Sequence, residues 1–214
     1  MHDVGIYENL ILGIHFLLLK KCKIFDEKTI VTCYTGRSMR INVRKHERRG
    51  YQSIKMSNIL EKQFLKQRND FEKSCVERDK KYHFPQGVIF EANIAYAKNK
   101  NKAHRLDRYR PKGKETQILP VIINVHGGGL LLGNKEFNKY FCALLSKKGF
   151  LVYSMEYRLI PDCTFFDQLR DIFLAMDFVK EHAAADGGDL SHVYLVGDSG
   201  GACLVTYANA IQNS

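Results

Sequence analysis

The pattern of apolar and polar positions divides the chain into an irregular first part and a longer, periodic second part. From Gly87 onward, short apolar runs alternate with segments of helical spacing. The runs 121–125 and 193–196 are almost continuously apolar and rich in β-branched residues. Strands that are buried on both faces have this composition, and such burial is typical of a mainly parallel sheet flanked by helices. The pattern therefore predicts an α/β fold.

The same pattern gives expected bounds for the individual elements of this second part. Strands are predicted at Val88–Tyr96, Arg105–Tyr109, Pro120–His126, Phe150–Tyr157 and Val193–Gly197. Helices are predicted at Lys135–Lys148, Phe165–His182 and Gly200–Gln212. Because strands alternate with helices, neighbouring strands are expected to be connected through helical crossovers.

A further helix is expected before the sheet. Asn58 and Glu61 have the spacing of a capping box, in which each side chain binds a free backbone N–H of the other residue. Apolar residues then recur along one helical face as far as about Lys81, namely Leu60, Phe64, Phe71 and Cys75. Such a stripe must cover an apolar surface, so we predict a cap-like helix that lies on the main domain.

Charge separates the first 55 residues from the rest of the chain. The 214 residues carry a formal net charge of +10, and residues 1–55 hold 11 Lys and Arg against 5 Asp and Glu. We therefore expect a basic leader of uncertain order (1–55), an N-terminal cap-like helical segment (56–84) and an α/β domain (85–214).

The basic residues of the leader gather near its end, at Arg37, Arg40, Arg44, Lys45, Arg48 and Arg49. On a helix, four of them would share one face, as in a helix that binds nucleic acid or an anionic membrane. A solvated leader, or residues upstream of a start at Met56, explains the cluster as well, and no aromatic residues or fold motif accompany the charge. We therefore favour a protein without a nucleic-acid partner.

Cysteine spacing and hydropathy exclude several other classes of protein. The six cysteines show no Cys-x-x-Cys spacing, which argues against a zinc site and a disulfide framework and favours a reduced, cytoplasmic chain without a metal. The apolar stretch 10–19 is too short to span a bilayer. Acidic Asp3 and Glu8 precede this stretch and Lys20 and Lys21 follow it, the reverse of a signal peptide. We expect neither export nor a membrane span.

The clearest chemical signal is the sequence Gly197-Asp198-Ser199-Gly200-Gly201, which lies between the run 193–196 and a predicted helix. A serine in a GxSxG pattern at this position sits on a sharp turn that lifts its hydroxyl above the sheet. The flanking glycines let neighbouring backbone approach, and the first N–H groups of the helix can face an oxyanion. We predict that Ser199 is a nucleophile, although a tight or phosphate-binding glycine turn has the same pattern.

A second glycine-rich motif, His126-Gly127-Gly128-Gly129, follows the run 121–125 about 70 residues before the serine. Three consecutive glycines suit no regular element and offer bare backbone N–H groups to a ligand. We predict an oxyanion hole formed by the N–H groups of Gly128, Gly129 and Gly200, each contributing about 3–4 kcal/mol to transition-state stabilisation. The remaining motif residues are expected to support the site, namely His126, Gly127, Gly197, Asp198 and Gly201. Of these, the polar residues His126 and Asp198 are expected to brace the glycine-rich turns.

These motifs, in this order and with GLLLG and Tyr157-Arg158-Leu159-Ile160-Pro161 between them, resemble the hormone-sensitive-lipase-like branch of the α/β-hydrolases. The similarity covers about residues 85–214, and 106–111 also resembles the second strand of that family. The resemblance implies a carboxylic ester hydrolase for small to medium acyl chains, with a helical cap and without a metal or organic cofactor. Two residues depart from the family pattern: Gly200 stands where alanine is common, and Asp162 where glutamate is common.

The sequence after the nucleophile departs further from the family. In this fold the triad acid and histidine follow the serine, but only fifteen residues follow Ser199, and none is Asp, Glu or His. His192 lies at the far end of the strand that leads to Ser199, about 20 Å away by rise alone, and His182 is expected at that same end. We therefore expect a C-terminally truncated, incomplete domain that is inactive by itself. The strand 193–196 is then expected to be a bare apolar edge prone to aggregation.

Two interpretations of function remain open from the sequence. In the first, the complete protein is a serine ester hydrolase that acts on a small ester through an acyl-enzyme. In the second, the chain is a catalytically inactive α/β-hydrolase-like binding module, whose glycine cradle holds a carboxylate. The retention of both motifs favours the first interpretation. The oligomeric state has no signal in the sequence.

Overall fold

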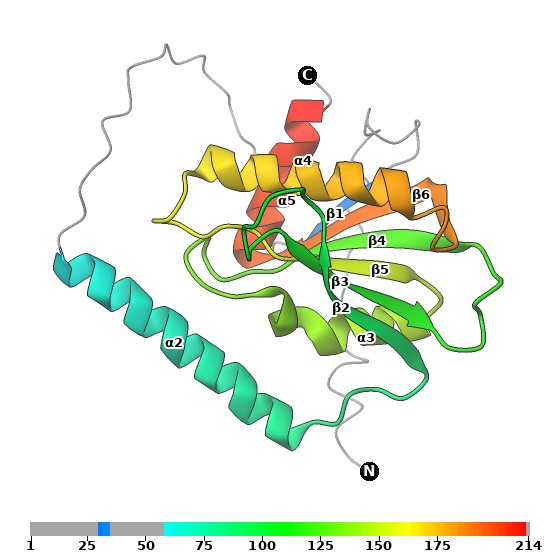
Figure 1. Ribbon diagram of the computed structural model, residues 1–214, viewed down its shortest axis with the longest axis horizontal. Coiled ribbons are helices and arrows are strands. Elements are labelled where there is room, and N and C mark those ends of the chain that lie inside the picture. Colours follow the sequence, from blue (N-terminus) through cyan, green and yellow to red (C-terminus); the bar gives the residue numbers. More distant parts are fainter. Residues whose placement is uncertain (1–29, 35–57, 213–214) are drawn as a thin grey trace.

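The computed structural model describes residues 30–34 and 58–212, and in them a mainly parallel sheet is flanked by helices (Figure 1). The strands are β1 (Ile30–Tyr34), β2 (Val88–Ala95), β3 (Arg105–Pro111), β4 (Leu119–Val125), β5 (Leu151–Met155) and β6 (Gly188–Asp198). The helices are α2 (Asn58–Lys81), the short 3-10 helix η1 (Lys135–Asn138), α3 (Lys139–Lys147), α4 (Phe165–His182) and α5 (Ser199–Gln212). The strand order is β1-β6-β4-β5-β3-β2, and β3 and β2 run antiparallel to their neighbours. The predicted α/β fold is confirmed.

Most elements lie close to their predicted bounds. The helices α2 and α4 begin and end at the predicted residues. The strand β6 is longer than expected, because it begins at Gly188, and the predicted helix 135–148 consists of η1 followed by α3. The exposed strand β2 is also found, although it lacks a continuous apolar run because it lies at the edge of the sheet.

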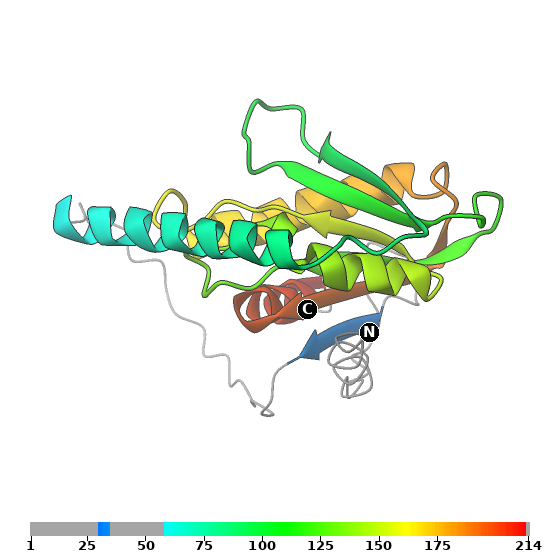
Figure 2. The same cartoon turned by 90° about the horizontal axis from the view of Figure 1, so that it is seen from below.

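The strand β1 corrects the sequence interpretation at the opposite edge. It belongs to the predicted leader and pairs in parallel with β6, from Ile30 opposite Tyr194 to Tyr34 opposite Asp198. Figure 2 shows β1 at this edge, and α5 contacts both β1 and β6. The expectation of a bare β6 edge was therefore wrong, because an N-terminal strand covers it. The basic cluster of the leader lies outside the described residues.

The core lies on both faces of the sheet, and β4 contributes to both. Val121, Ile123 and Val125 pack into the cluster that contains the buried residues of α4 and α5. Ile122 points to the other face, where it joins the cluster that includes Cys142 of α3. This alternation is the normal side-chain period of a strand. Burial of both faces explains why β4 is almost continuously apolar in the sequence.

The helix α2 lies beside the loops that follow β4 and β5 (Figures 1 and 2). Its predicted apolar stripe faces the body, since Cys75 is buried and the Phe71 ring lies 5.0 Å from the Phe137 ring of η1. Leu65 and Val76 lie outside this stripe and are exposed. Among the described residues, no helix is both long enough and apolar enough to cross a membrane.

Candidate functional site

Ser199 lies at the turn between β6 and α5, because β6 ends at Asp198 and α5 begins at Ser199. Its φ of 47° is in the left-handed region, which a residue with a side chain adopts only when its surroundings enforce it. Ser199 is also exposed. A strained, accessible serine between a buried strand and a helix has the geometry of the nucleophile turn of α/β-hydrolases.

Two glycines permit this turn by leaving space for neighbouring backbone. A Cβ atom on Gly201 would lie 2.2 Å from the carbonyl oxygen of Val125 and 2.5 Å from that of His126. A Cβ atom on Gly197 would lie 2.6 Å from the carbonyl carbon of Gly201. All three distances are shorter than real Cβ contacts. A side chain on Gly201 would force the first turn of α5 away from the end of β4, and one on Gly197 would force it away from the end of β6.

Asp198 joins the serine turn to the glycine-rich segment that follows β4. Its Oδ1 accepts hydrogen bonds from the Gly127 N–H at 2.9 Å and from Asn138 Nδ2 at 2.8 Å. A Cβ atom on Gly127 would lie 2.2 Å from Asp198 Oδ2. The carboxylate therefore holds the two motifs together. Asn138, at the end of η1, had no signal in the sequence.

The backbone of the glycine-rich segment also meets Gly200. A Cβ atom on Gly200 would lie 3.0 Å from the backbone nitrogens of both Gly129 and Leu130. The structure thus brings Gly129 and Gly200 together, as their predicted shared role requires, and adds Leu130. The sequence analysis missed Leu130 because it used glycine alone as the sign of an accessible N–H, whereas Leu130 has a φ of 71° and continues the same bend.

The glycine-rich bend, residues 128–132, is closed by two hydrogen bonds to one carbonyl group. The Gly128 oxygen accepts hydrogen bonds from the N–H groups of Leu131 at 3.2 Å and Leu132 at 3.1 Å. A Cβ atom on Gly128 would lie 1.9 Å from the Leu132 oxygen, so only glycine fits. Because a trans peptide directs its C=O and N–H to opposite sides, the Gly129 N–H points away from these two donors. The bend therefore orients the donor that was predicted for the oxyanion hole.

His126 is fully buried behind the bend. Its Nδ1 lies 2.7 Å from the Gly127 oxygen and its Nε2 lies 3.0 Å from Glu156 Oε1, while its ring stacks on Tyr157 at 4.3 Å. Burial alone would lower the pKa of His126, but the Glu156 carboxylate, the hydrogen bond to it and the Gly127 carbonyl outweigh burial and raise that pKa. Both partners are acceptors, so a ring that binds both must be protonated on both nitrogens. Such a ring braces the bend and accepts no proton from a serine.

His104, His182 and His192 are not placed to act as a base for Ser199. His104 is buried, with Nε2 bonded to Asp171 at 3.0 Å. His182 is the last residue of α4, and His192 lies six residues before the carboxyl end of β6. His182 and His192 were already excluded from the sequence by the same topological reasoning.

Polar residues inside the fold bind Lys135, the first residue of η1, and were not identified from the sequence. Glu156 Oε2 accepts from the Lys135 N–H at 3.0 Å, and Ser154 Oγ donates to the Lys135 oxygen at 3.2 Å. The Lys135 ammonium lies 3.1 Å from Asp107 Oδ1 in a buried ion pair. Burial raises the pKa of Asp107 despite this partner. The available signal was a polar residue within an apolar strand, such as Ser154.

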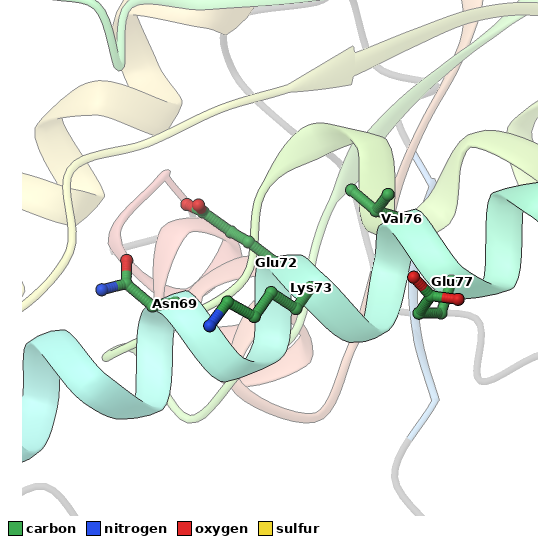
Figure 3. Close-up of a pocket in the computed structure, with 5 residues that line it drawn as sticks. All are labelled: Asn69, Glu72, Lys73, Val76 and Glu77. Carbon is green, nitrogen blue, oxygen red and sulfur yellow. The ribbon is translucent and has the colours of Figure 1, made fainter.

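Two hollows adjoin α2, and neither is lined by the serine turn. A hollow of about 320 Å³ is lined by α2 residues alone, namely Asn69, Glu72, Lys73, Val76 and Glu77 (Figure 3). A second, of about 510 Å³, lies between α2 and the loops after β4 and β5 and includes Glu156 and Tyr157 in its lining. Within the described part of the chain, no group of three His, Cys, Asp or Glu residues could hold a metal ion.

Comparison with known proteins places this architecture in a family. The model of the BD-FAE family matches residues 106–214, which is half of the chain. The chain belongs to the BD-FAE family of α/β-hydrolase esterases. The resemblance to hormone-sensitive-lipase-like esterases is confirmed as to family, whereas the roles of individual motif residues stay predictions.

Relatives and solved structures agree with this assignment. A probable isoprenylcysteine alpha-carbonyl methylesterase of Oryza sativa subsp. japonica is 36% identical over 99 residues, covering 46% of this chain and 23% of the relative. A versiconal hemiacetal acetate esterase of Dothistroma septosporum is 28% identical over 130 residues, covering 60% of this chain and 39% of the relative. Esterase B from Lactobacillus rhamnosis has a TM-score of 0.70 at 28% identity, covering 73% of this chain and 51% of that chain. The chain thus spans well under half the length of these two curated relatives.

Proposed function

We propose that the protein is a carboxylic ester hydrolase in which Ser199 forms an acyl-enzyme. The observation that supports this proposal is the approach of two backbone nitrogens, those of Gly129 and Leu130, to within 3.0 Å of the Cβ position of Gly200. Backbone nitrogens from two separate segments thereby lie close together beside a strained and exposed serine. Such convergence is what stabilises the oxyanion of a tetrahedral intermediate.

In the proposed reaction, Ser199 Oγ attacks the ester carbonyl carbon and its proton passes to a general base. The carbonyl oxygen becomes an oxyanion and accepts hydrogen bonds from the N–H groups of Gly129 and Gly200, with Gly128 as the third predicted donor. The base returns the proton to the leaving alcohol as the acyl-enzyme forms. Water, deprotonated by the base, then attacks the acyl carbon and releases the acid, and the proton returns to Ser199 Oγ. The names of two relatives specify methyl and acetate esters, which supports small groups on one side of the substrate ester.

In this proposal the general base lies outside the described residues. His126 is hydrogen-bonded to acceptors through both ring nitrogens, and His104 is bonded to Asp171. His182 ends α4, and His192 lies six residues before the carboxyl end of β6. An inactive binding module is the second candidate, and it is favoured by this same lack of a base. The two candidates differ in whether Ser199 reacts covalently once a base is available.

Added imidazole provides such a base and tests the proposal. We expect a p-nitrophenyl alkylphosphonate to phosphonylate the 1–214 chain at a rate that rises with imidazole concentration. The phosphorus–Oγ bond forms as p-nitrophenolate leaves, and peptide mass spectrometry locates the adduct on Ser199. Ser199→Ala is the control and is expected to stay unmodified. An adduct of equal yield in Ser199→Ala, or no adduct in the unmodified chain at any imidazole concentration, would reject the nucleophile and favour the binding module.

A further inference from the structure

Arg68 of α2 binds the backbone of two loops at once. Its Nε donates to the Leu131 oxygen at 2.8 Å, and one terminal nitrogen donates to the Ile160 oxygen at 2.7 Å. The other terminal nitrogen donates to Asp162 Oδ2 at 2.7 Å. Only 16% of the side chain is exposed, although it lies on a highly polar helix. A planar guanidinium with a fixed set of donors suits such a multiple contact, and a lysine could not reproduce it.

The two loops that Arg68 binds are also bonded to each other. The Ile160 N–H donates to the Leu130 oxygen at 3.0 Å, and Gln168 Nε2 of α4 donates to the same oxygen at 2.9 Å. The Arg68 guanidinium therefore binds two loops that already bind each other: the loop after β4 and the loop after β5. Among the hydrogen bonds and ion pairs of the described residues, the one from Arg68 to Leu131 joins α2 to the glycine-rich bend.

The Leu131 carbonyl is linked to the oxyanion-hole donor through two peptide planes. Its peptide carries the Leu132 N–H, which donates to the Gly128 oxygen at 3.1 Å. The peptide of the Gly128 oxygen carries the Gly129 N–H, whose nitrogen lies beside Gly200. Because each peptide is planar, fixing a carbonyl on one side fixes the direction of the N–H on the other. The positively charged guanidinium that donates to the Leu131 oxygen also polarises the later hydrogen bonds of such a series.

We propose that Arg68 is a positioning residue for the oxyanion hole: through the Leu131 carbonyl it sets the direction of the Gly129 N–H and polarises it toward the substrate oxygen. This role rests on the proposed function of Ser199. It gives α2 a part in the reaction, since the helix supplies the positive charge behind the glycine-rich bend. The cap-like helix is thereby coupled to transition-state stabilisation without touching the substrate.

Arg78 provides a matched control on the same helix. Its terminal nitrogens donate to the carbonyl oxygens of Phe137 at 2.7 Å and Glu136 at 3.1 Å, so it also binds two backbone carbonyls. Its target is η1 rather than the glycine-rich bend. Arg68→Met and Arg78→Met each keep helix propensity and an unbranched side chain while they remove the guanidinium. Loss of α2 docking alone would affect both variants alike.

The test measures the saturation kinetics of phosphonylation in the full 1–214 chain with imidazole. We expect Arg68→Met to lower the maximal rate of inactivation roughly tenfold, less than the roughly 10²–10³-fold loss of a deleted donor. The concentration for half-maximal rate should stay within about twofold, because ground-state binding does not use the oxyanion hole. Arg78→Met should retain the maximal rate. Arg68→Lys keeps the charge but not the multiple contact, so its maximal rate of inactivation should lie between those of Arg68→Met and the unmodified chain.

The positioning role would be overturned if Arg68→Met and Arg78→Met lowered the maximal rate of inactivation equally. It would also be overturned if Arg68→Met changed only the concentration for half-maximal rate. If the unmodified chain is not labelled at all, the proposed function fails, and hydrogen–deuterium exchange then decides the inference separately. Arg68→Met should speed exchange of the amides in 129–132, and Arg78→Met should not. Equal exchange in these amides would overturn the coupling of α2 to the bend. If Arg68→Met does not fold, as judged by circular dichroism, the same comparison is made with Arg68→Lys.

Discussion

Gly200 illustrates how the site depends on single atoms. Related esterases commonly have alanine at this position, yet a methyl group here would lie 3.0 Å from the nitrogens of Gly129 and Leu130. Contacts this short are rare for real Cβ atoms, so the bend would have to move by a few tenths of an ångström. The space that the absent side chain leaves is filled by the backbone that carries the predicted oxyanion donors.

Gly200→Ala is therefore expected to slow imidazole-assisted labelling of Ser199 by several-fold. The displaced Gly129 N–H would lose part of its hydrogen bond to the oxyanion, which is worth about 3–4 kcal/mol when complete. Stability should change by less than about 1 kcal/mol, because the higher helix propensity of alanine offsets the local strain. Labelling rates and urea unfolding of both chains measure the two effects. An unchanged labelling rate would show that the bend does not depend on this contact.

At the level of elements, β1 changes the picture of the sheet most. Five residues of a charged N-terminal segment form a parallel strand beside β6, the strand that leads to Ser199. Without β1, the backbone N–H and C=O groups on that side of β6 would be free to pair with another chain. The strand order thus joins the first part of the chain to the strand that leads to Ser199.

Deletion of residues 1–57 is expected to make the protein aggregate. The remaining chain keeps α2 and the rest of the sheet but leaves β6 as an unpaired edge with an apolar sequence. Static light scattering of the two purified chains at equal concentration and pH measures the effect. Similar monodispersity of both chains would mean that β1 does not protect this edge.

At the level of the whole molecule, a buried ion pair connects the ends of β4 and β5. The pKa of His126 is raised by Glu156 and by its hydrogen bonds, in spite of burial. A histidine with a raised pKa in the folded state stabilises the fold fully below its unfolded value of 6.5, and this stabilisation disappears as the pH rises through the folded-state pKa. His126 also binds the Gly127 carbonyl beside the bend, so its protonation affects both the stability of the fold and the geometry of the candidate site.

The urea midpoint is therefore expected to decrease as the pH is raised from about 6 toward 9, above the usual histidine pKa of about 6.5. Glu156→Gln removes the charge that raises the pKa of His126, so its midpoint should start lower and decline less over the same range. Unfolding curves of both chains at each pH, followed by circular dichroism, measure the difference. Parallel pH profiles would show that the His126–Glu156 pair does not carry the dependence.

The sequence by itself determined the α/β class, the bounds of α2 and α4 and the order of the two glycine-rich motifs. It could do so because buried strands, helical stripes and sharp turns each restrict local residue types. The tertiary structure alone decided that β1 covers β6, that Leu130 joins Gly129 beside Gly200 and that Arg68 reaches the bend. Each of these contacts joins residues far apart in the chain and uses backbone atoms on at least one side. Every residue type carries such atoms, so the side-chain pattern does not show which segments meet.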